Sequence, residues 1–179
     1  MTRCILCGLL GLAALAVAAT APTAVTLGAA PTLAAPAAAA LAGAPSEAAA
    51  LALYQRFAAA QNRHDLAAVG DLLLDSPRFL WVSDGKSIWG REAVLKRMAL
   101  FQEARIWQVE PALDKAATVA IDEHAAFLHL PLVLSLAFTA APPERLSFLV
   151  SVLCVETPSG WRIAALFTTT ANPDSDSPG

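Results

Sequence analysis

The hydrophobic positions of the chain change their period near residue 105, from helical spacing before it to strand-like alternation after it. The first part predicts three amphipathic helices, over residues 46–61, 66–73 and 91–101. Asp65 is the expected N-cap of the second helix, because its carboxylate can accept the free amide hydrogens two or three residues later. The predicted inward faces of the helices carry these residues: Leu51, Tyr54, Phe57, Ala58, Gln61, Leu66, Val69, Leu72, Leu73, Val94, Leu95, Met98 and Phe101.

Alternating positions predict one short strand between the second and third helices, over residues 79–83. Phe79, Trp81 and Ser83 share one face of this strand, and we expect that face to point into the domain. After the helices, alternation and turn residues predict five more strands, at 106–113, 118–121, 124–139, 145–156 and 161–170. Helices that precede a run of antiparallel strands indicate an α+β fold.

The first 45 residues do not follow this pattern. Arg3 and the apolar run after it have the form of a secretory signal peptide, residues 1–18, with cleavage expected after Ala18. The alternative is an uncleaved membrane anchor, because the run approaches the roughly 20 residues of a membrane-spanning helix. Residues 19–45 are rich in Ala and Pro and carry no charge, which predicts a disordered spacer. We therefore expect an exported protein, periplasmic or secreted, that contacts a membrane only if the leader is retained.

Residues 46–171 are long enough for one compact domain, and 172–179 are expected to form a disordered tail. Arg3 is one of the 12 Lys and Arg residues, so 11 remain beside 15 Asp and Glu, a net charge of −4. The chain shows no basic stripe, so nucleic acid is not an expected partner. Lys96 and Arg97 are expected on the solvated face of the third helix.

The stretch from Phe57 to Met98 resembles the SnoaL-like, nuclear transport factor 2-like superfamily. The resemblance rests on Asn62 and Asp65 at the first break between helices, on Gly90 and the residues that open the third helix, and on the closing segment 160–167. It implies a cone-shaped α+β fold, with three helices packed on a curved antiparallel sheet and a pocket between them. Many members pair through the outer face of the sheet, which makes a homodimer an expectation.

The same resemblance implies which residues occupy the catalytic positions of the ketosteroid isomerases in this superfamily. Those enzymes use an aspartate base on the first strand, and a tyrosine and a protonated aspartate as hydrogen-bond donors. Phe57 stands at the tyrosine position, Trp81 at the base position and Val152 near the second acid. None of these side chains can perform the corresponding step, so isomerase chemistry of this type is not expected.

The pocket is instead expected to be apolar and aromatic, and to suit a small apolar ligand. Its predicted lining residues are Tyr54, Phe57, Trp81, Trp89, Phe127 and Val152. For Trp81 the alternative is core filling, because a tryptophan side chain buries a large apolar area. His129 and Glu110 are the catalytic candidates, although His129 lies between two leucines and equally suits a structural, partly buried histidine.

The histidines and cysteines show no spacing typical of a metal site. His124 and His129 would face opposite sides of a regular strand. Cys4 and Cys7 would leave with the leader, and Cys154 alone can form no intramolecular disulfide. We expect neither a metal nor a cofactor.

Three functions from different classes remain open. The first is an exported, non-enzymatic domain that binds a small apolar ligand or a protein partner. The second is an isomerase, dehydratase or cyclase acting on small hydrophobic substrates through His129 or Glu110. The third is an envelope interaction domain, tethered to the membrane by an uncleaved leader. The vacant isomerase positions within an intact fold pattern favour the first hypothesis.

Overall fold

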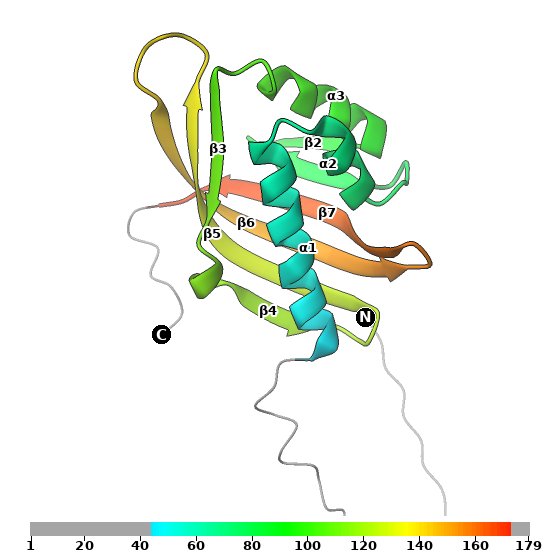
Figure 1. Ribbon diagram of the computed structural model, residues 1–179. Helices are drawn as coiled ribbons and strands as arrows, with labels where there is room; N and C mark the ends of the chain where they lie inside the picture. Colours follow the sequence, from blue (N-terminus) through cyan, green and yellow to red (C-terminus); the bar gives the residue numbers. More distant parts are fainter. Residues whose placement is uncertain (1–43, 173–179) are drawn as a thin grey trace, which may run out of the picture. The chain divides into compact units, whose positions relative to one another are not determined.

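The computed structural model describes residues 44–172 of the chain (Figure 1). The predicted signal peptide, nearly all of the predicted spacer and all but the first residue of the predicted tail lie outside these residues. Pro45, which we assigned to the spacer, is the first residue of helix α1. Proline suits this position because the first turn of a helix leaves its backbone N–H groups unpaired. Within residues 44–172, no helix has both the length and the apolar character needed to cross a membrane.

The described residues form an α+β fold, as predicted. The helices are α1 (Pro45–Asn62), α2 (Leu66–Leu72) and α3 (Arg91–Phe101). The strands are β1 (Leu80–Ser83), β2 (Lys86–Trp89), β3 (Ile106–Pro111), β4 (Ala117–Ala120), β5 (Ala125–Ala137), β6 (Glu144–Thr157) and β7 (Gly160–Thr170). A 3-10 turn, Leu113–Lys115, separates β3 from β4.

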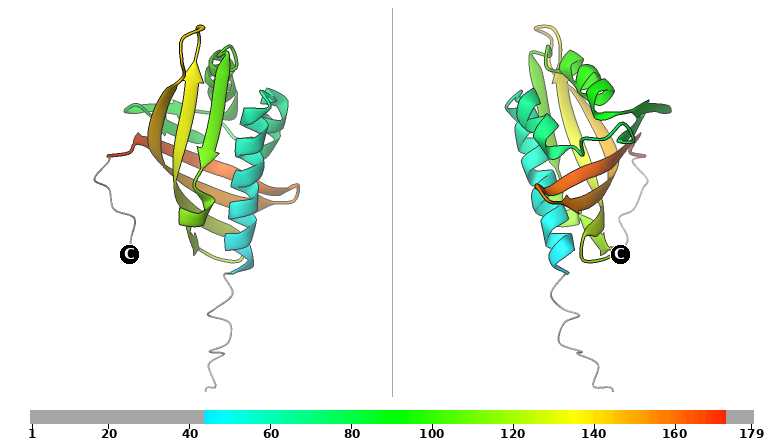
Figure 2. Two further views of the ribbon diagram at one scale, coloured as in Figure 1. Left: turned by 60° about the vertical axis from the view of Figure 1, so that its left-hand side comes forward. Right: turned by 90° about the vertical axis from the view of Figure 1, so that its right-hand side faces the viewer.

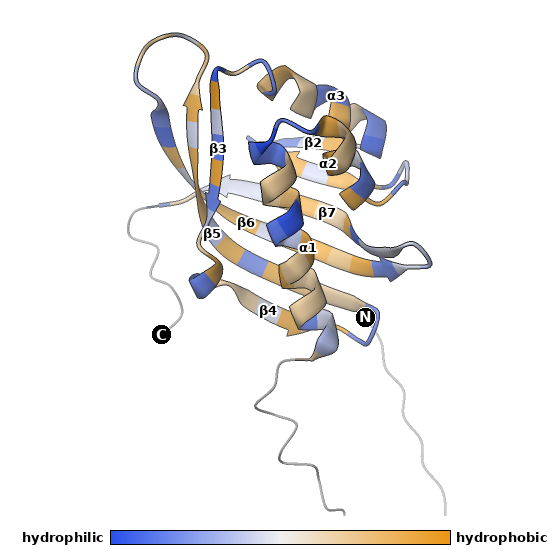
Figure 3. Ribbon diagram, viewed as in Figure 1, coloured by the Kyte–Doolittle hydropathy of each residue, from blue (hydrophilic) through white to orange (hydrophobic). Residues whose placement is uncertain are grey.

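All strands belong to one sheet with the order β2-β1-β7-β6-β5-β3, and β4 also pairs with β5. The sheet is mixed rather than purely antiparallel, because β1 runs parallel to β7. The long strands β5 and β6 are bent and twisted, so that the sheet wraps around one side of α1 (Figure 2). Apolar residues recur along the strands behind α1, and hydrophilic residues gather at the turns (Figure 3).

Helix α1 is held against the sheet at both of its ends. At its start, the Glu47 carboxylate accepts hydrogen bonds from the backbone N–H groups of Ala44 and Ala120, each at 3.1 Å. At its end, the Asn62 side chain bonds to the backbone of Val109 in β3. The next helix starts as predicted, because the Asp65 carboxylate accepts a hydrogen bond from the Ala68 N–H at 2.9 Å.

Strand alternation divides the sheet into an inner face toward α1 and an outer face. Phe79, Trp81 and Ser83 are buried, which confirms the predicted inward face around β1. Along β5, the even-numbered residues from Ala126 to Leu134 are buried, and the odd-numbered residues between them are only partly covered. The core therefore lies between the inner face of the sheet and the three helices.

Two local expectations were wrong. Strand β2 was not predicted, since its four residues after the turn are mostly exposed and show no buried alternation. His124 lies in the turn before β5 and not in the strand, because β5 begins at Ala125. The predicted opposition of His124 and His129 across one strand therefore does not arise.

Candidate functional site

A cavity of about 220 Å³ lies between α1, α3 and the inner face of the sheet. Its walls come from the C-terminal half of α1, the C-terminal half of α3, and the inward positions of β1, β3, β5, β6 and β7. Three of the predicted lining residues, Tyr54, Phe57 and Trp81, lie in this cavity. It is a partly open, mostly apolar space beside the filled core.

The inner end of the cavity is formed by one stripe of α1. Tyr54, Phe57 and Gln61 recur at helical spacing, and each is buried. Burial raises the pKa of the Tyr54 phenol, so its hydroxyl is neutral throughout the physiological range. This hydroxyl makes no hydrogen bond with another residue in the 44–172 range, and it is accessible from the cavity. The inner end thus offers a neutral polar group within apolar walls.

Three aromatic side chains form a continuous wall near the mouth. The Phe101 ring stacks on the Trp107 ring with centroids 5.1 Å apart, and it meets the Trp81 ring edge-on at 6.5 Å. Trp81 is held in place by a hydrogen bond from its Nε1 to the Thr168 hydroxyl at 3.2 Å. All of these residues line the cavity, so an aromatic or aliphatic ring could pack against them.

The mouth carries one ion pair. The Arg97 guanidinium contacts the Asp84 carboxylate at 3.3 Å, and Asp84 lines the cavity. The guanidinium also lies over the rings of Trp81 and Phe101, at 5.5 and 5.6 Å from their centroids. Arg97 is therefore not on a purely solvated face of α3, as the sequence led us to expect. Its cationic group packs on aromatic faces, which a guanidinium favours.

The other three predicted lining residues lie outside the cavity. Trp89 pairs with Leu80 across the β1–β2 hairpin, so its side chain shares the outer face with Leu80 and is 58% exposed. Phe127 occupies an odd-numbered, outer position of β5, one residue out of register with the inward set. Val152 does point inward and is fully buried, but the cavity ends at Val150 and the core is filled around Val152.

The two catalytic candidates also lie apart from the cavity. His129 is on the outer face, where its Nδ1 lies 2.9 Å from the Ser151 hydroxyl on β6. Glu110 is an exposed residue of β3 that forms an ion pair with Arg145 at 3.1 Å. Neither side chain lines the cavity, so neither is placed to act on a molecule bound there.

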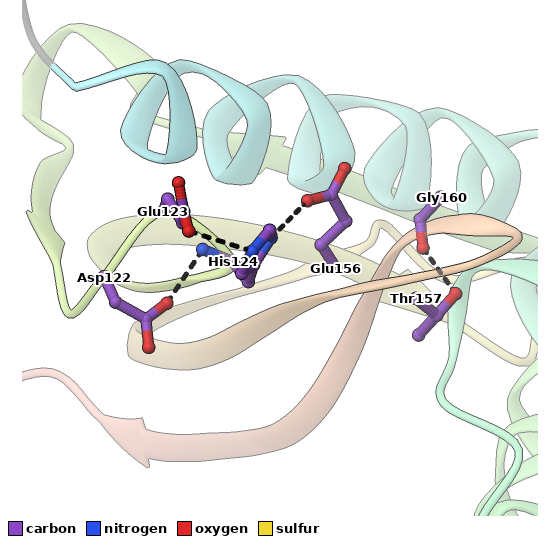
Figure 4. Close-up of polar contacts among 6 residues, drawn as sticks. All are labelled: Asp122, Glu123, His124, Glu156, Thr157 and Gly160. Carbon is purple, nitrogen blue, oxygen red and sulfur yellow. Dashed lines mark hydrogen bonds and ion pairs between the residues drawn. The ribbon is translucent and has the colours of Figure 1, made fainter.

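Other reactive groups have structural explanations. Burial raises the pKa of the Cys154 thiol to about 12, so it carries no thiolate at neutral pH. His124 is an exposed turn residue surrounded by acids, with Nδ1 2.8 Å from Glu156 and Nε2 3.2 Å from Glu123 (Figure 4). Among residues 44–172, no cluster of His, Cys, Asp or Glu has the arrangement needed to hold a metal ion.

Most of the cavity wall was not identified from the sequence. The missing residues are the inward positions of the long strands, above all Leu132, Leu134 and Leu136 of β5. Their alternation was visible, but the register that separates inward from outward positions was not. Phe101 was predicted only as an inward residue of the third helix, and Trp107 was not singled out, because their stacking depends on the approach of α3 to β3.

The profile of the SnoaL-like domain family matches residues 50–166 of this chain. No curated protein matches the sequence of this chain. Among solved structures, an uncharacterised protein with a cystatin-like fold from Caulobacter vibrioides shares 20% identity and a TM-score of 0.61, over 72% of this chain and 92% of the other.

Two further structures show the same fold. A nuclear transport factor 2-like protein of unknown function from Shewanella oneidensis MR-1 has 16% identity and a TM-score of 0.56, over 68% of this chain and 96% of the other. A nuclear transport factor 2-like superfamily protein from Salmonella enterica serovar Typhimurium LT2 has 12% identity and a TM-score of 0.62, over 75% and 96%. At these identities the likeness establishes the fold and not the activity.

Proposed function

The chain belongs to the SnoaL-like domain family, and we propose that it is a binding domain for a small, mostly apolar molecule held in the cavity between α1, α3 and the sheet. The observation that carries this proposal is the cavity itself. Proteins close-pack their interiors, and an apolar space of this size beside a filled core has a free-energy cost unless a ligand occupies it.

The volume of the cavity limits the size of the ligand. An apolar cavity of about 150 Å³ accommodates benzene, which has six non-hydrogen atoms. By proportion, the 220 Å³ cavity suits about nine such atoms, the size of a single substituted ring or two small fused rings. A steroid nucleus, with about twice as many atoms, exceeds this space.

The buried polar groups of the cavity are few and neutral. The Tyr54 hydroxyl, the Gln61 amide and the Ser83 hydroxyl belong to buried residues that line it. Binding sites for small molecules combine mainly apolar walls with a few such groups, which orient the ligand. The cavity has this composition.

The side chains of the cavity support ligand binding without isomerase chemistry. Phe57 and Trp81, which stand at the expected donor and base positions, both line the cavity and neither can transfer a proton. Asp84 is the carboxylate that borders the cavity, and Arg97 pairs with it at the mouth. A general base must reach the proton that it removes, and no residue at the inner end has that capacity.

We also propose that the domain acts outside the cytoplasm. The support is the sequence of the leader, in which Arg3 precedes an uninterrupted apolar run and small residues stand near Ala18. Determination of the N-terminal residue of the protein isolated from its host tests this proposal. A mature chain that begins near residue 19 is expected, and a chain that retains residues 1–18 in a soluble cell extract would exclude it.

Methyl NMR tests binding and locates it. Indole, with nine non-hydrogen atoms, is titrated into protein labelled at the leucine and valine methyl groups. We expect saturable shifts at Leu132, Leu134 and Val150, which line the cavity, and none at the exposed Val119 of β4.

A cavity-filling variant supplies the control. Val150→Phe places a ring into the cavity and should abolish the indole shifts. Val119→Phe makes the same chemical change at an exposed position and should leave them intact. If wild-type protein shows no saturable shifts, or if Val150→Phe binds indole as well as wild type, the cavity is not the binding site.

A further inference from the structure

Four buried side-chain polar atoms in residues 44–172 have no hydrogen-bond partner. One of them, Arg91 Nε, belongs to a side chain already held by Asp75 and the Gly70 carbonyl. The other three are Arg97 Nε, Gln102 Oε1 and Trp107 Nε1. A buried polar atom without a partner is unfavourable, so a concentration of them at one place calls for an explanation.

Two of these side chains, Arg97 and Trp107, contact the ring of Phe101, which lines the cavity. Trp107 stacks on the Phe101 ring, the Arg97 guanidinium lies over it, and Gln102 follows it in the chain. Gln102 and Trp107 line the cavity. All three unpartnered atoms are closed off from solvent, and Arg97 itself is not a lining residue, so a ligand reaches them only when the side chains at this place move apart.

The Arg97 guanidinium has spare donors. A guanidinium has five N–H groups, and here one 3.3 Å contact joins its Nη2 to Asp84. The Asp84 side chain is 64% exposed, and an exposed ion pair of this kind contributes little. Asp84 can thus move to solvent and leave the guanidinium free to bind another anion.

We propose that the ligand of this cavity is a small aromatic or alicyclic carboxylic acid, whose carboxylate binds at the mouth to Arg97 and Trp107. This inference rests on the proposed function, because the ring system occupies the cavity described above. The ring packs against Trp81 and Phe101, and the carboxylate accepts from the guanidinium and from the Trp107 indole N–H. A half-turn of the Gln102 amide brings its NH₂ group to the same oxygens.

The chemistry of the mouth favours an anion over a neutral polar group. Two of the three unpartnered atoms are donors, and one of them belongs to a cation. A planar guanidinium matches the two oxygens of a carboxylate, and such charge-assisted pairs are stronger than neutral hydrogen bonds. A ligand carboxylate that takes the place of the Asp84 carboxylate also forms an ion pair with the Arg97 guanidinium.

Two matched ligands test this inference on the full-length chain. 2-Naphthoate and 2-naphthamide have the same ring system and nearly the same shape, but only the first is charged at pH 7. We expect naphthoate to bind about 10- to 100-fold more tightly by titration calorimetry, the range of one charge-assisted pair. Indole is titrated in parallel by methyl NMR, as a ligand with no carboxylate.

Variants assign the effect to particular atoms. Arg97→Gln should remove the preference for naphthoate and change naphthamide affinity less than about threefold, while Arg97→Lys restores part of it. Trp107→Phe keeps the ring stacked on Phe101 and should weaken naphthoate binding about three- to tenfold. Arg56→Gln, on an exposed residue outside the cavity, changes the net charge equally and should have no effect.

The outcomes separate this inference from the proposed function. Equal affinity for the two naphthyl ligands, or equal loss of both in Arg97→Gln, overturns the carboxylate site. Binding of indole without any binding of naphthoate overturns it as well and leaves the cavity function standing. Failure of all three ligands to bind wild-type protein overturns both.

Discussion

The side-chain amide of Asn62 pairs with the backbone of Val109 in both directions. Its Nδ2 donates to the Val109 carbonyl oxygen at 2.9 Å, and the Val109 N–H donates to its Oδ1 at 2.7 Å. Strand β3 lies at an edge of the sheet, so the amide substitutes for a missing neighbouring strand. Gln61 and Val109 both line the cavity, and this pair of bonds fixes the distance between the walls that they form.

Asn62→Ala is expected to lower the free energy of unfolding by about 2–4 kcal/mol, because it leaves a partly buried N–H and C=O without partners. Urea unfolding followed by far-UV circular dichroism measures this loss. Arg63→Ala, at the exposed neighbouring position, is the control and should stay within about 0.5 kcal/mol of wild type. If Asn62→Ala lowers the free energy of unfolding no more than Arg63→Ala does, these bonds do not hold α1 to β3.

Tyr54→Phe is expected to leave the free energy of unfolding unchanged or to raise it by up to about 1 kcal/mol. The hydroxyl has no protein partner in residues 44–172 and is accessible from the cavity, so its removal breaks no hydrogen bond within the protein. The same urea measurement applies. A loss above about 1.5 kcal/mol would mean that the hydroxyl has a strong partner in the folded protein.

Cys154 should be inert toward thiol reagents in the folded protein. Its side chain is fully buried, and burial raises the pKa of its thiol to about 12. In a Cys4→Ser, Cys7→Ser variant, we expect a disulfide reagent at pH 8 to titrate no thiol in buffer and one thiol in denaturant. Rapid labelling in buffer would place Cys154 at the surface and contradict the register of β6.

His124 should titrate above the ordinary range of a histidine. The hydrogen bond with Glu156 is the main cause of its raised pKa, with the charges of Glu123, Glu156 and Asp122 adding to the effect. A raised folded-state pKa means that its contribution to stability is complete below the unfolded pKa near 6.5, and is lost as pH rises through the folded value. NMR titration of the imidazole protons measures this pKa, and Glu156→Gln should lower it. If the pKa of His124 is unchanged in Glu156→Gln, the hydrogen bond with Glu156 is not the cause of the raised pKa.

The sequence was sufficient for the helices because polar breaks such as Asn62–Asp65 interrupt clear helical periods. It was insufficient for contacts that depend on the arrangement of distant elements. The parallel pairing of β1 with β7 joins segments about 85 residues apart and has no local signal. The predicted position of Phe127 in the cavity lining was wrong for another reason. A shift of one residue along a strand moves a side chain to the opposite face of the sheet.

The candidate site was predictable only where α1 and β1 form it. Tyr54 and Phe57 follow from helical spacing, and Trp81 from the alternation around β1. Arg97 resembled a surface residue because its charge gave no sign that aromatic rings lie beneath it. Its position depends on how α3 packs over β1 and β3, which no local pattern in the sequence specifies.

Native mass spectrometry of the full protein isolated from its own host, without added ligand, is the most direct test of the central claim that this cavity holds a small molecule. We predict an additional mass of about 120–200 Da, the range for about nine ring atoms with a head group, that is lost on denaturation. The same preparation of Val150→Phe should lack it, while Val119→Phe should retain it. A bare wild-type mass, or an additional mass that Val150→Phe retains, would contradict the account.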